Sequence, residues 1–460
     1  MIRYPLLSDK FVLRESDSQK SLYSLKNGDN YDLTAEQLNF LLLLDGRLPL
    51  NKVIQFYDSE SRGNAEDFLK NLLAIGAVDF KEERLSRPRN LLSKKVPDER
   101  LESVHLEASS ECNMKCVHCY QNKYMQRKER LGFSEIISLL DQMVELQVNN
   151  VGISGGEPLL LPEVFDVMHE IEARNMRISS LFTNGLLIDD AFIDRIKSMR
   201  SDFGIFISLD SISTEGMSFR GFKKKAAKSA VEKILRSIKF LTRNNVKVIL
   251  NTVVNSANIQ ELEEMYSLIQ ELNVDSWRIG FPKQTNLFKK NLKRFNVEWK
   301  VIAERCLHLL ELHFDNRMPF HLQIEYLFRE ELFENGFPEE VSDDDFVCDY
   351  EGRRSECCIK PNGDVVSCAY CYDLPIGNIR ESSLWNIWYS EKMKSVKKIR
   401  IGDVMECRNC ELKSLCATGC RANAFFLHSD FNNAKDDYAC QAVGFFREKV
   451  IPVLKRANFF

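Results

Sequence analysis

The sequence predicts an α/β protein whose central part is a partial (β/α)6 TIM-like barrel, with a small α+β domain before it and a cysteine-rich domain after it. Short apolar strands alternate with amphipathic helices from residue 104 to about 281. This alternation is typical of parallel strands joined by right-handed crossovers. Residues 1–90 show a different order of elements. Of the 14 cysteines, none precedes Cys112 and ten lie between Cys348 and Cys440.

The first 90 residues predict a winged-helix domain. The segments FVLRES and SLYSLKNG are expected strands, with a turn at Asn27-Gly28. Thr34 has the features of a helix start, and Gly46 should end that helix. Two further helices are expected at 50–57 and 65–73, followed by a strand at 77–80. Residues 91–103 are charge-rich and are predicted to be a linker, with a surface helix as the alternative.

The barrel is predicted over residues 104–285. Its expected strands cover 104–109, 150–155, 177–185, 203–211, 247–255 and 277–281. Its expected helices cover 134–147, 163–174, 189–199, 227–244 and 259–272. Active sites of such barrels lie at the carboxyl ends of the strands. A helical bridging region (286–345), a cysteine-rich domain (346–445) and a C-terminal helix (446–460) should follow.

Composition excludes several classes of function. The 460 residues include 63 Lys+Arg and 67 Asp+Glu, and a net charge of −4 gives no cationic footprint for nucleic acid or a membrane surface. The longest aliphatic run, Leu41 to Leu44, is far shorter than the roughly 20 residues of a spanning helix. The N-terminus lacks the pattern of a signal peptide. We therefore expect a cytoplasmic protein, in which cysteines more often serve metals, clusters or catalysis than disulfides.

The first cysteine group follows the first predicted barrel strand. Cys112, Cys116 and Cys119 have the spacing C-x3-C-x2-C. Three thiolates at this spacing can bind three irons of a cubane cluster and leave the fourth iron open to a substrate or cofactor. A zinc site with His118 or His105 as the fourth ligand is the alternative.

Short polar motifs follow the next three predicted strands in order. They are Gly155-Gly156-Glu157-Pro158, Thr183-Asn184-Gly185 and Ser208-Leu209-Asp210, with Arg220 twelve residues after Ser208.

Together with the cysteine motif, these segments resemble the radical S-adenosylmethionine (SAM) superfamily over residues 104–285. The resemblance implies that the three cysteines are catalytic and hold a [4Fe–4S] cluster whose open iron binds SAM. It implies that Glu157 accepts the SAM amino group, and that the neighbouring glycines allow close backbone approach to the ligand. Ser208 and Arg220 would hold the ribose and carboxylate. The remaining residues assigned to cofactor binding are Pro158, Asn184 and Asp210.

The second cysteine field begins at Cys348. It continues with Gly363-x4-Cys368, Cys407-x2-Cys410-x5-Cys416-x3-Cys420 and finally Cys440. This pattern resembles the seven-cysteine SPASM domain, which carries auxiliary [4Fe–4S] clusters. A zinc ribbon is the alternative, since C-x2-C is common in zinc sites. The resemblance implies one ligand set of Cys407, Cys410, Cys416 and Cys440, and another of Cys348, Cys368 and Cys420.

Three fully ligated clusters need eleven cysteines if SAM supplies the twelfth ligand, and the motifs account for ten. The spare cysteines are Cys306, Cys357, Cys358 and Cys371. We expect Cys357 to be the eleventh ligand, with Cys358 next. Alternatively, that iron is open and binds a substrate thiolate. Cys306 lies in an apolar helical stretch and is expected to be a core residue.

Residues 1–90, with the segment Gly76-Ala77-Val78 at their end, resemble the precursor recognition element of enzymes that modify ribosomally made peptides. Such domains bind a leader peptide as an added strand at a sheet edge. A DNA-binding winged helix is the alternative, but the acidic chain has no basic recognition helix.

These resemblances predict a radical SAM oxidoreductase that matures a precursor peptide, similar to sactisynthases and ranthipeptide synthases. A 5′-deoxyadenosyl radical would abstract hydrogen, and a cysteine sulfur would join a carbon in a thioether. The alternatives are C–C or C–O crosslinking, a sulfatase-type formylglycine maturase, and a non-enzymatic multi-cluster electron carrier or peptide-binding adaptor. The N-terminal domain speaks against the maturase, and the SAM motifs speak against the carrier. The expected partners are the leader-bound precursor and a flavodoxin- or ferredoxin-type electron donor.

Overall fold

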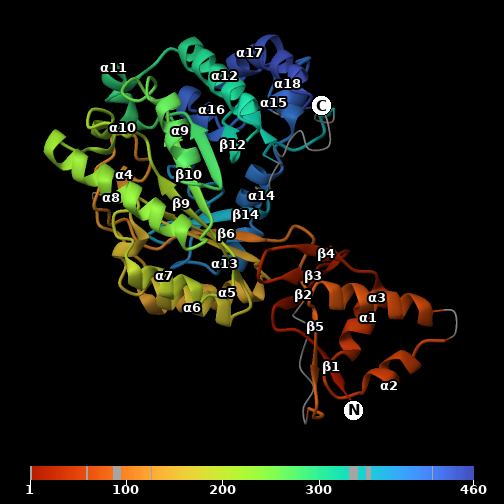
Figure 1. Cartoon of the computed structure of the whole chain (residues 1–460). Coiled ribbons are helices and arrows are strands. Elements are labelled where there is room, and N and C mark those ends of the chain that lie inside the picture. The colour runs from red at the N-terminus through yellow and green to blue at the C-terminus, as the bar shows by residue number, and fades with distance from the viewer. Residues whose placement is uncertain are drawn as a thin grey trace.

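The computed structural model describes residues 3–58, 61–85, 95–125, 127–330, 340–348, 354–416 and 418–459. A small N-terminal unit lies beside a larger body that contains the barrel and the cysteine-rich region (Figure 1). Residues 91–94 of the predicted linker lie outside the described residues.

The N-terminal unit combines two small antiparallel sheets with three helices. Thr34 caps the first helix: its hydroxyl accepts from the backbone N–H of Gln37, whose side chain accepts from the backbone N–H of Thr34. The helix therefore begins where the sequence predicts it. One sheet has the order β2-β3-β4 and the other pairs β1 with β5, so β1 and β4 add to the three predicted strands. The elements are β1 (Tyr4–Leu7), β2 (Phe11–Glu15), β3 (Lys20–Ser24), β4 (Asn30–Asp32), α1 (Ala35–Leu43), α2 (Leu50–Gln55), α3 (Arg62–Ala74) and β5 (Val78–Lys81).

Eleven strands of the described residues form one large sheet in the order β13-β12-β11-β10-β9-β8-β7-β6-β14-β15-β16. The six strands predicted for the barrel are all present and pair in parallel. They are β6 (Ser103–Glu107), β7 (Asn150–Ser154), β8 (Arg177–Thr183), β9 (Gly204–Ser208), β10 (Val248–Val253) and β11 (Ser276–Gly280). The predicted α/β fold with a partial barrel is thus confirmed.

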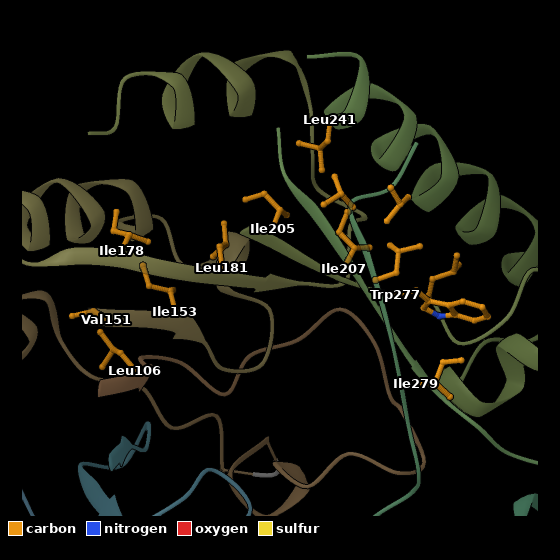
Figure 2. Packing of buried hydrophobic residues seen from close by; sticks show 14 of the residues in the cluster. Leu106, Val151, Ile153, Ile178, Leu181, Ile205, Ile207, Leu241, Trp277 and Ile279 are labelled. Atoms are coloured by element: carbon orange, nitrogen blue, oxygen red, sulfur yellow. The ribbon is translucent and has the colours of Figure 1, made fainter. Parts of the chain in front are cut away.

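Amphipathic helices follow the barrel strands and cover their outer face. Figure 2 shows Ile207 of β9 and Leu241 of α8 among the fully buried side chains of this core. Burial of such side chains drives the packing of helix on sheet. In the described part of the protein, no helix combines the length and the apolar character needed to cross a membrane. The helices are α5 (Phe133–Glu145), α6 (Val164–Ala173), α7 (Asp190–Lys197), α8 (Lys224–Arg243) and α9 (Leu262–Glu271).

The bridging region differs from its prediction, because it contributes strands as well as helices. After α10 (Asn286–Lys289), α11 (Leu292–Phe295) and α12 (Trp299–Asp315), strand β12 (His321–Ile324) pairs in parallel with β11. A short strand, β13 (Phe328–Arg329), then turns back on β12. The segment His321–Ile324 alternates polar and apolar residues, which is the pattern of a half-buried strand.

The cysteine-rich region adds strands to the opposite edge of the same sheet. β14 (Glu356–Ile359) pairs in parallel with β6, and the hairpin strands β15 (Asp364–Val366) and β16 (Gly377–Asn378) follow. The predicted C-terminal helix is the end of a longer helical segment, in which a π-helical turn at Phe446–Val450 joins two α-helices. The remaining elements are α13 (Leu384–Trp388), α14 (Glu391–Lys397), α15 (Lys413–Cys416), α16 (Arg421–His428), α17 (Asp437–Phe445) and α18 (Ile451–Arg456).

The N-terminal unit docks on the barrel at the amino ends of its strands. The buried guanidinium of Arg14 donates to the side chain of Asn149 (2.8 Å) and to the backbone carbonyl of Asn175 (2.8 Å). The hydroxyl of Tyr23 donates to the side chain of Asn150, the first residue of β7. The unit therefore lies at the opposite end of the strands from Cys112, which follows the carboxyl end of β6.

Candidate active site at the carboxyl ends of the barrel strands

The first three cysteines lie on one loop that leaves β6 and ends before the short helix α4 (Asn122–Met125). The backbone N–H of Met114 donates to the sulfur of Cys112 (3.4 Å), and a guanidinium N–H of Arg220 donates to the sulfur of Cys116 (3.9 Å). Donors of this kind stabilise thiolates.

Burial makes these thiols unfavourable as free thiolates. It raises the pKa of Cys112, and it raises the pKa of Cys116 to about 11 and that of Cys119 to about 12. Metal binding removes the proton outright, so three half-buried thiols, two of them beside N–H donors, fit a metal-bound role. In the parts of the protein that the structure describes, no three His, Cys, Asp or Glu side chains converge on a single metal ion.

The histidines proposed for zinc point elsewhere. His118 stacks on Phe219 with ring centroids 4.0 Å apart, and its Nε2 lies 3.9 Å from Asp210. Burial lowers the pKa of His118 to about 4, so its ring is neutral at physiological pH. His105 lies within β6 and packs edge-on against Phe182.

The glycines of the Gly155-Gly156-Glu157-Pro158 motif serve the protein's own backbone. A Cβ on Gly155 would lie 2.4 Å from the carbonyl oxygen of Ser109, and one on Gly156 would lie 2.1 Å from that of Glu111. The N–H of Gly156 donates to Ser109 (2.8 Å), and the N–H of Glu157 donates to Glu111 (2.7 Å). These contacts hold the start of the cysteine loop against the end of β7. The need to avoid a clash with these two carbonyl oxygens explains the glycines more directly than the approach to a ligand that the sequence suggested.

Glu157 is locked in place by the end of the neighbouring strand β8. Its carboxylate is 1% exposed and accepts from the hydroxyl of Thr183 (2.7 Å) and the backbone N–H of Asn184 (2.7 Å). Burial raises its pKa, although these hydrogen bonds act in the opposite direction. The side chain of Asn184 donates to Asn113 (2.6 Å) and so ties this strand end to the cysteine loop. Pro158, also buried, begins a single 3-10 turn.

Arg220 is held by Asp210 in a buried ion pair. Its Nε donates to the Asp210 carboxylate (2.7 Å), whose other oxygen accepts from the backbone N–H of Val253 (2.8 Å). Burial acts to lower the pKa of Arg220, but the charges of Asp210 and Cys116 outweigh it and the net shift is upward. The geometry makes Asp210 a residue that positions Arg220. Ser208, the last residue of β9, lies beside this pair in sequence and is half-buried.

The cysteines of the C-terminal region form two separate groups. Cys348 interacts electrostatically with Cys368 and Cys420. In the second group, Cys416 interacts with its three neighbours Cys407, Cys410 and Cys440. Burial raises the pKa of Cys348 to about 11 and that of Cys416 to about 12. This grouping matches the two ligand sets that the resemblance implies.

The structure favours Cys371 over Cys357 as the additional cysteine of the first group. Cys357 pairs with Val104 across the β6–β14 ladder, and its side chain lies in the barrel core. Cys358, on the opposite face of β14, packs in the cluster that contains Cys368, Cys371 and Cys420. A hydrogen bond with Cys368, together with burial, raises the pKa of Cys371. Cys357, the residue expected from the sequence, faces the core because side chains alternate between the two faces of a strand. Cys306 is a fully buried core residue, as expected.

The sequence alone did not reveal the ion pair between Glu107 and Lys360. The ammonium of Lys360 donates to the carboxylate of Glu107 (2.8 Å) and to the carbonyl of Ala369 (2.8 Å), and both charged side chains are fully buried. The hydroxyl of Tyr120, next to Cys119, also donates to Glu107 (3.0 Å). The pair joins the first cysteine loop to the 368–371 segment. The sequence did contain one indication of this pair: Glu107 ends the apolar strand β6, and Lys360 directly follows the apolar strand β14.

Comparison with known proteins agrees with this architecture. Residues 106–269 match the radical SAM superfamily, and residues 348–411 match the SPASM iron–sulfur cluster-binding domain. An AdoMet-dependent heme synthase of Methanosarcina barkeri is 25% identical over 342 residues, covering 71% of this chain and 92% of the synthase. A PqqA peptide cyclase of Gluconobacter oxydans is 24% identical over 354 residues, covering 74% and 90%. The structure of Streptococcus suis SuiB bound to the precursor peptide SuiA shares the fold: the TM-score is 0.66 with 16% identity, over 95% of this chain and 99% of SuiB.

The fold and the two domain matches define a radical SAM enzyme. More particularly, it is one that combines the radical SAM domain with an SPASM domain, and such enzymes use [4Fe–4S] clusters together with SAM. The residues present fit these groups. Three half-buried thiols lie near the carboxylate of Glu157 and the charged Arg220, and two further groups of thiols lie in the C-terminal region.

Proposed function

We propose that this enzyme modifies a ribosomally made precursor peptide by joining a cysteine sulfur to a carbon in a thioether. The observation that carries the peptide assignment is the N-terminal unit docked on the barrel through Arg14 and Tyr23. A catalytic barrel that acts on a small free molecule needs no such domain. The likeness in fold to SuiB, which was crystallised with a precursor peptide, supports the same assignment.

The leader of the precursor would bind along β4. In the described residues this strand has a partner only on its β3 side. A cavity of about 360 Å³ begins two residues further on at Thr34 and lies between α1 and α3, where Phe40, Tyr57 and Phe68 supply aromatic surface. An extended leader would add a strand to the sheet edge and place an apolar side chain in this cavity. This is the basis for assigning residues 1–90 as a precursor recognition domain.

Cys112, Cys116 and Cys119 would hold the [4Fe–4S] cluster that binds SAM. When bound, this pair supplies the reductive cleavage of SAM that leads to hydrogen abstraction from an unactivated C–H bond. Glu157 would receive the SAM amino group, because Thr183 and Asn184 hold its carboxylate at the strand end.

Arg220 and Ser208 would bind the SAM carboxylate and ribose. Arg220 is kept charged and oriented by Asp210, so little reorganisation is needed when an anionic group arrives. The stacked rings of His118 and Phe219 would help to exclude water from this side of the cysteine loop.

The two C-terminal groups would hold auxiliary clusters. Cys407, Cys410, Cys416 and Cys440 form one set. Cys348, Cys368 and Cys420 form the other, with Cys371 as its fourth member in place of Cys357. This gives three clusters per protein molecule. Forming a thioether after hydrogen abstraction leaves one electron to be removed, and a cluster close to the barrel mouth is suited to accept it.

The same architecture supports a second candidate reaction. Carbon–carbon or carbon–oxygen crosslinking of peptide side chains is the second candidate, and the docked N-terminal unit, which a formylglycine maturase does not need, favours it over that activity. Neither a carrier nor an adaptor accounts for the buried SAM-side pair of Arg220 and Asp210.

An acidic flavodoxin- or ferredoxin-type protein in the cytoplasm would supply the electron. Exposed basic residues surround the first cysteine loop. Phe219 packs on Phe288 and Phe295, and a Cβ on Gly221 would lie 2.4 Å from the Lys115 carbonyl oxygen. These contacts pack α10 and α11 against the cysteine loop at Val117. Helices α4 and α8 lie on the same side of the barrel (Figure 1). The exposed cations are Lys115, Lys223, Lys225, Lys228, Lys290 and Lys293. On a protein of net charge −4, this surface favours an acidic partner.

Co-expression with the short peptides encoded beside its gene, followed by mass spectrometry, tests the function. Each new bond removes two hydrogens from the peptide. Thiol alkylation before analysis separates the chemistries, because a thioether consumes a free thiol and a C–C bond does not. A hydrazide probe detects formylglycine. Modified peptide with all its thiols still alkylatable would refute the thioether assignment while keeping the peptide assignment.

A further inference from the structure

Arg421 is a buried cation whose charge has no acidic partner in the described residues. It is the first residue of α16, directly after Cys420, and its side chain is 1% exposed. Its Nη2 donates to the carbonyl oxygen of Ala434. Its Nε and Nη1 are buried and have no hydrogen-bond acceptor in the described residues.

This arrangement is costly unless an anionic group lies beside it. A guanidinium stays charged at all physiological pH values, and an unpaired buried charge destabilises a fold strongly. The nearby carboxylate of Asp430, whose pKa the charge of Arg421 helps to lower, is half-buried, and it already accepts from the backbone N–H groups of Asn432 and Asn433. The compensating negative charge must therefore come from elsewhere.

Thiols of both auxiliary groups are the close candidates. Cys348 belongs to the first group and Cys407 to the second, and both pack in one apolar cluster with Val404 and Ile401. Burial raises the pKa of each thiol to about 11, and the charge of Arg421 acts in the opposite direction on both. Arg421 is thus electrostatically coupled to both ligand sets.

We propose that Arg421 is a shared charge-compensating residue that raises the reduction potentials of both auxiliary clusters. The proposal rests on the ligand sets assigned above. Each cluster with its thiolates is anionic, and reduction adds one further negative charge to it. A buried cation with free N–H donors stabilises the reduced form more than the oxidised form. The effect favours electron transfer onto these clusters, and it needs no change in the protonation of Arg421.

The test compares Arg421→Gln and Arg421→Lys in a Cys112→Ala, Cys116→Ala, Cys119→Ala background, so that only the auxiliary clusters contribute. Each protein is titrated anaerobically with dithionite, and the reduced clusters are counted by electron paramagnetic resonance at fixed potentials. We expect Arg421→Gln to lower the ratio of reduced to oxidised cluster at least tenfold, which corresponds to about 59 mV for one electron. Arg421→Lys, which keeps the charge, should fall between this variant and the parent.

Arg408→Gln is the matched control, because Arg408 lies next to Cys407 in sequence but is exposed and donates to the carbonyl of Gly402. It should leave both potentials unchanged. Unchanged potentials in Arg421→Gln with full iron content would overturn the proposal alone. A parent protein without iron would overturn it together with the ligand sets. If Arg421→Gln loses iron, the iron content of Arg421→Lys decides between the explanations. Full iron content in Arg421→Lys supports a role for the charge, and an iron loss equal to that of Arg421→Gln overturns the proposal. No peptide takes part, so the result does not depend on the substrate assignment.

Discussion

The carboxylate of Glu107 and the ammonium of Lys360 lie 2.8 Å apart with both side chains fully buried, and they join the first barrel strand to the cysteine-rich region 253 residues later. The hydroxyl of Tyr120 and the carbonyl of Ala369 complete their hydrogen bonds. Such a pair is favourable only while it is intact, because either partner alone is a buried, uncompensated charge.

Lys360→Met should therefore destabilise the enzyme by about 3–5 kcal/mol, since it leaves Glu107 unpaired. Anaerobic thermal unfolding of the cluster-loaded protein measures this. The double variant Glu107→Gln, Lys360→Met should lose less than the single one. Lys123→Met is the control: Lys123 pairs with Asp373 at 3.1 Å on the surface, and its loss should cost less than about 1 kcal/mol. Equal losses for both lysines would contradict the role of the buried pair.

Anaerobically prepared protein should carry about twelve irons per molecule, as three cubane clusters held by cysteine thiolates require. Replacing Cys112, Cys116 and Cys119 by Ala should remove about four of them.

Cys371→Ala should lower the iron content or make the first auxiliary cluster labile, because it removes a ligand, whereas Cys357→Ala should cost only core packing. Iron and sulfide analysis with absorption spectra decides this. Iron loss from Cys357→Ala and none from Cys371→Ala would restore the assignment made from sequence.

Glu157→Gln and Arg220→Met should each weaken SAM binding roughly tenfold or more, the value of a charge-assisted hydrogen bond of about 1.5–3 kcal/mol. Asp210→Asn should weaken it as well, because Arg220 loses the partner that orients it. Equilibrium titration of SAM measures the affinity, and the iron content of each variant must match the parent. Normal affinity in both Glu157→Gln and Arg220→Met would place the SAM pocket elsewhere.

Deleting residues 1–90 should abolish tight precursor binding and leave slow, uncoupled cleavage of SAM, because recognition and SAM cleavage lie at opposite ends of the strands. Binding of the leader peptide and release of 5′-deoxyadenosine are measured in parallel. Since the deletion exposes Asn149 and Asn175, a point variant in the leader cavity, Phe68→Asp, provides a second test. Modification of the full precursor at the parental rate by both variants would rule out this domain as the recognition site.

Charge reversal at Lys225 and Lys293 should slow reduction of the first cluster by flavodoxin hydroquinone roughly tenfold at low salt, because both lysines lie on the surface around the cysteine loop. Stopped-flow absorbance follows the reaction, and reduction by dithionite should be unchanged. Lys449→Glu, an exposed lysine on the C-terminal helical segment, is the control. Equal rates in all three proteins would place the docking surface elsewhere.

The sequence alone determined the features that depend on local spacing. The order of strands and helices follows from apolar periodicity, and the capped start of α1 follows from Thr34 and Gln37. The spacing of Cys112, Cys116 and Cys119 predicted a cluster loop, because ligands close in sequence can fold around one group. The same holds for the C-x2-C-x5-C run that begins at Cys407.

Tertiary structure alone decided which distant residues meet. Strand β14 pairs with β6, and this register turns Cys357 into the core and brings Cys371 to the first auxiliary group. The same pairing brings Lys360 to Glu107. The close packing of Gly156 on Glu111 likewise depends on two strand ends that lie side by side. Local patterns specify the faces of each element, but contacts between elements depend on sheet order and register, which no single segment encodes.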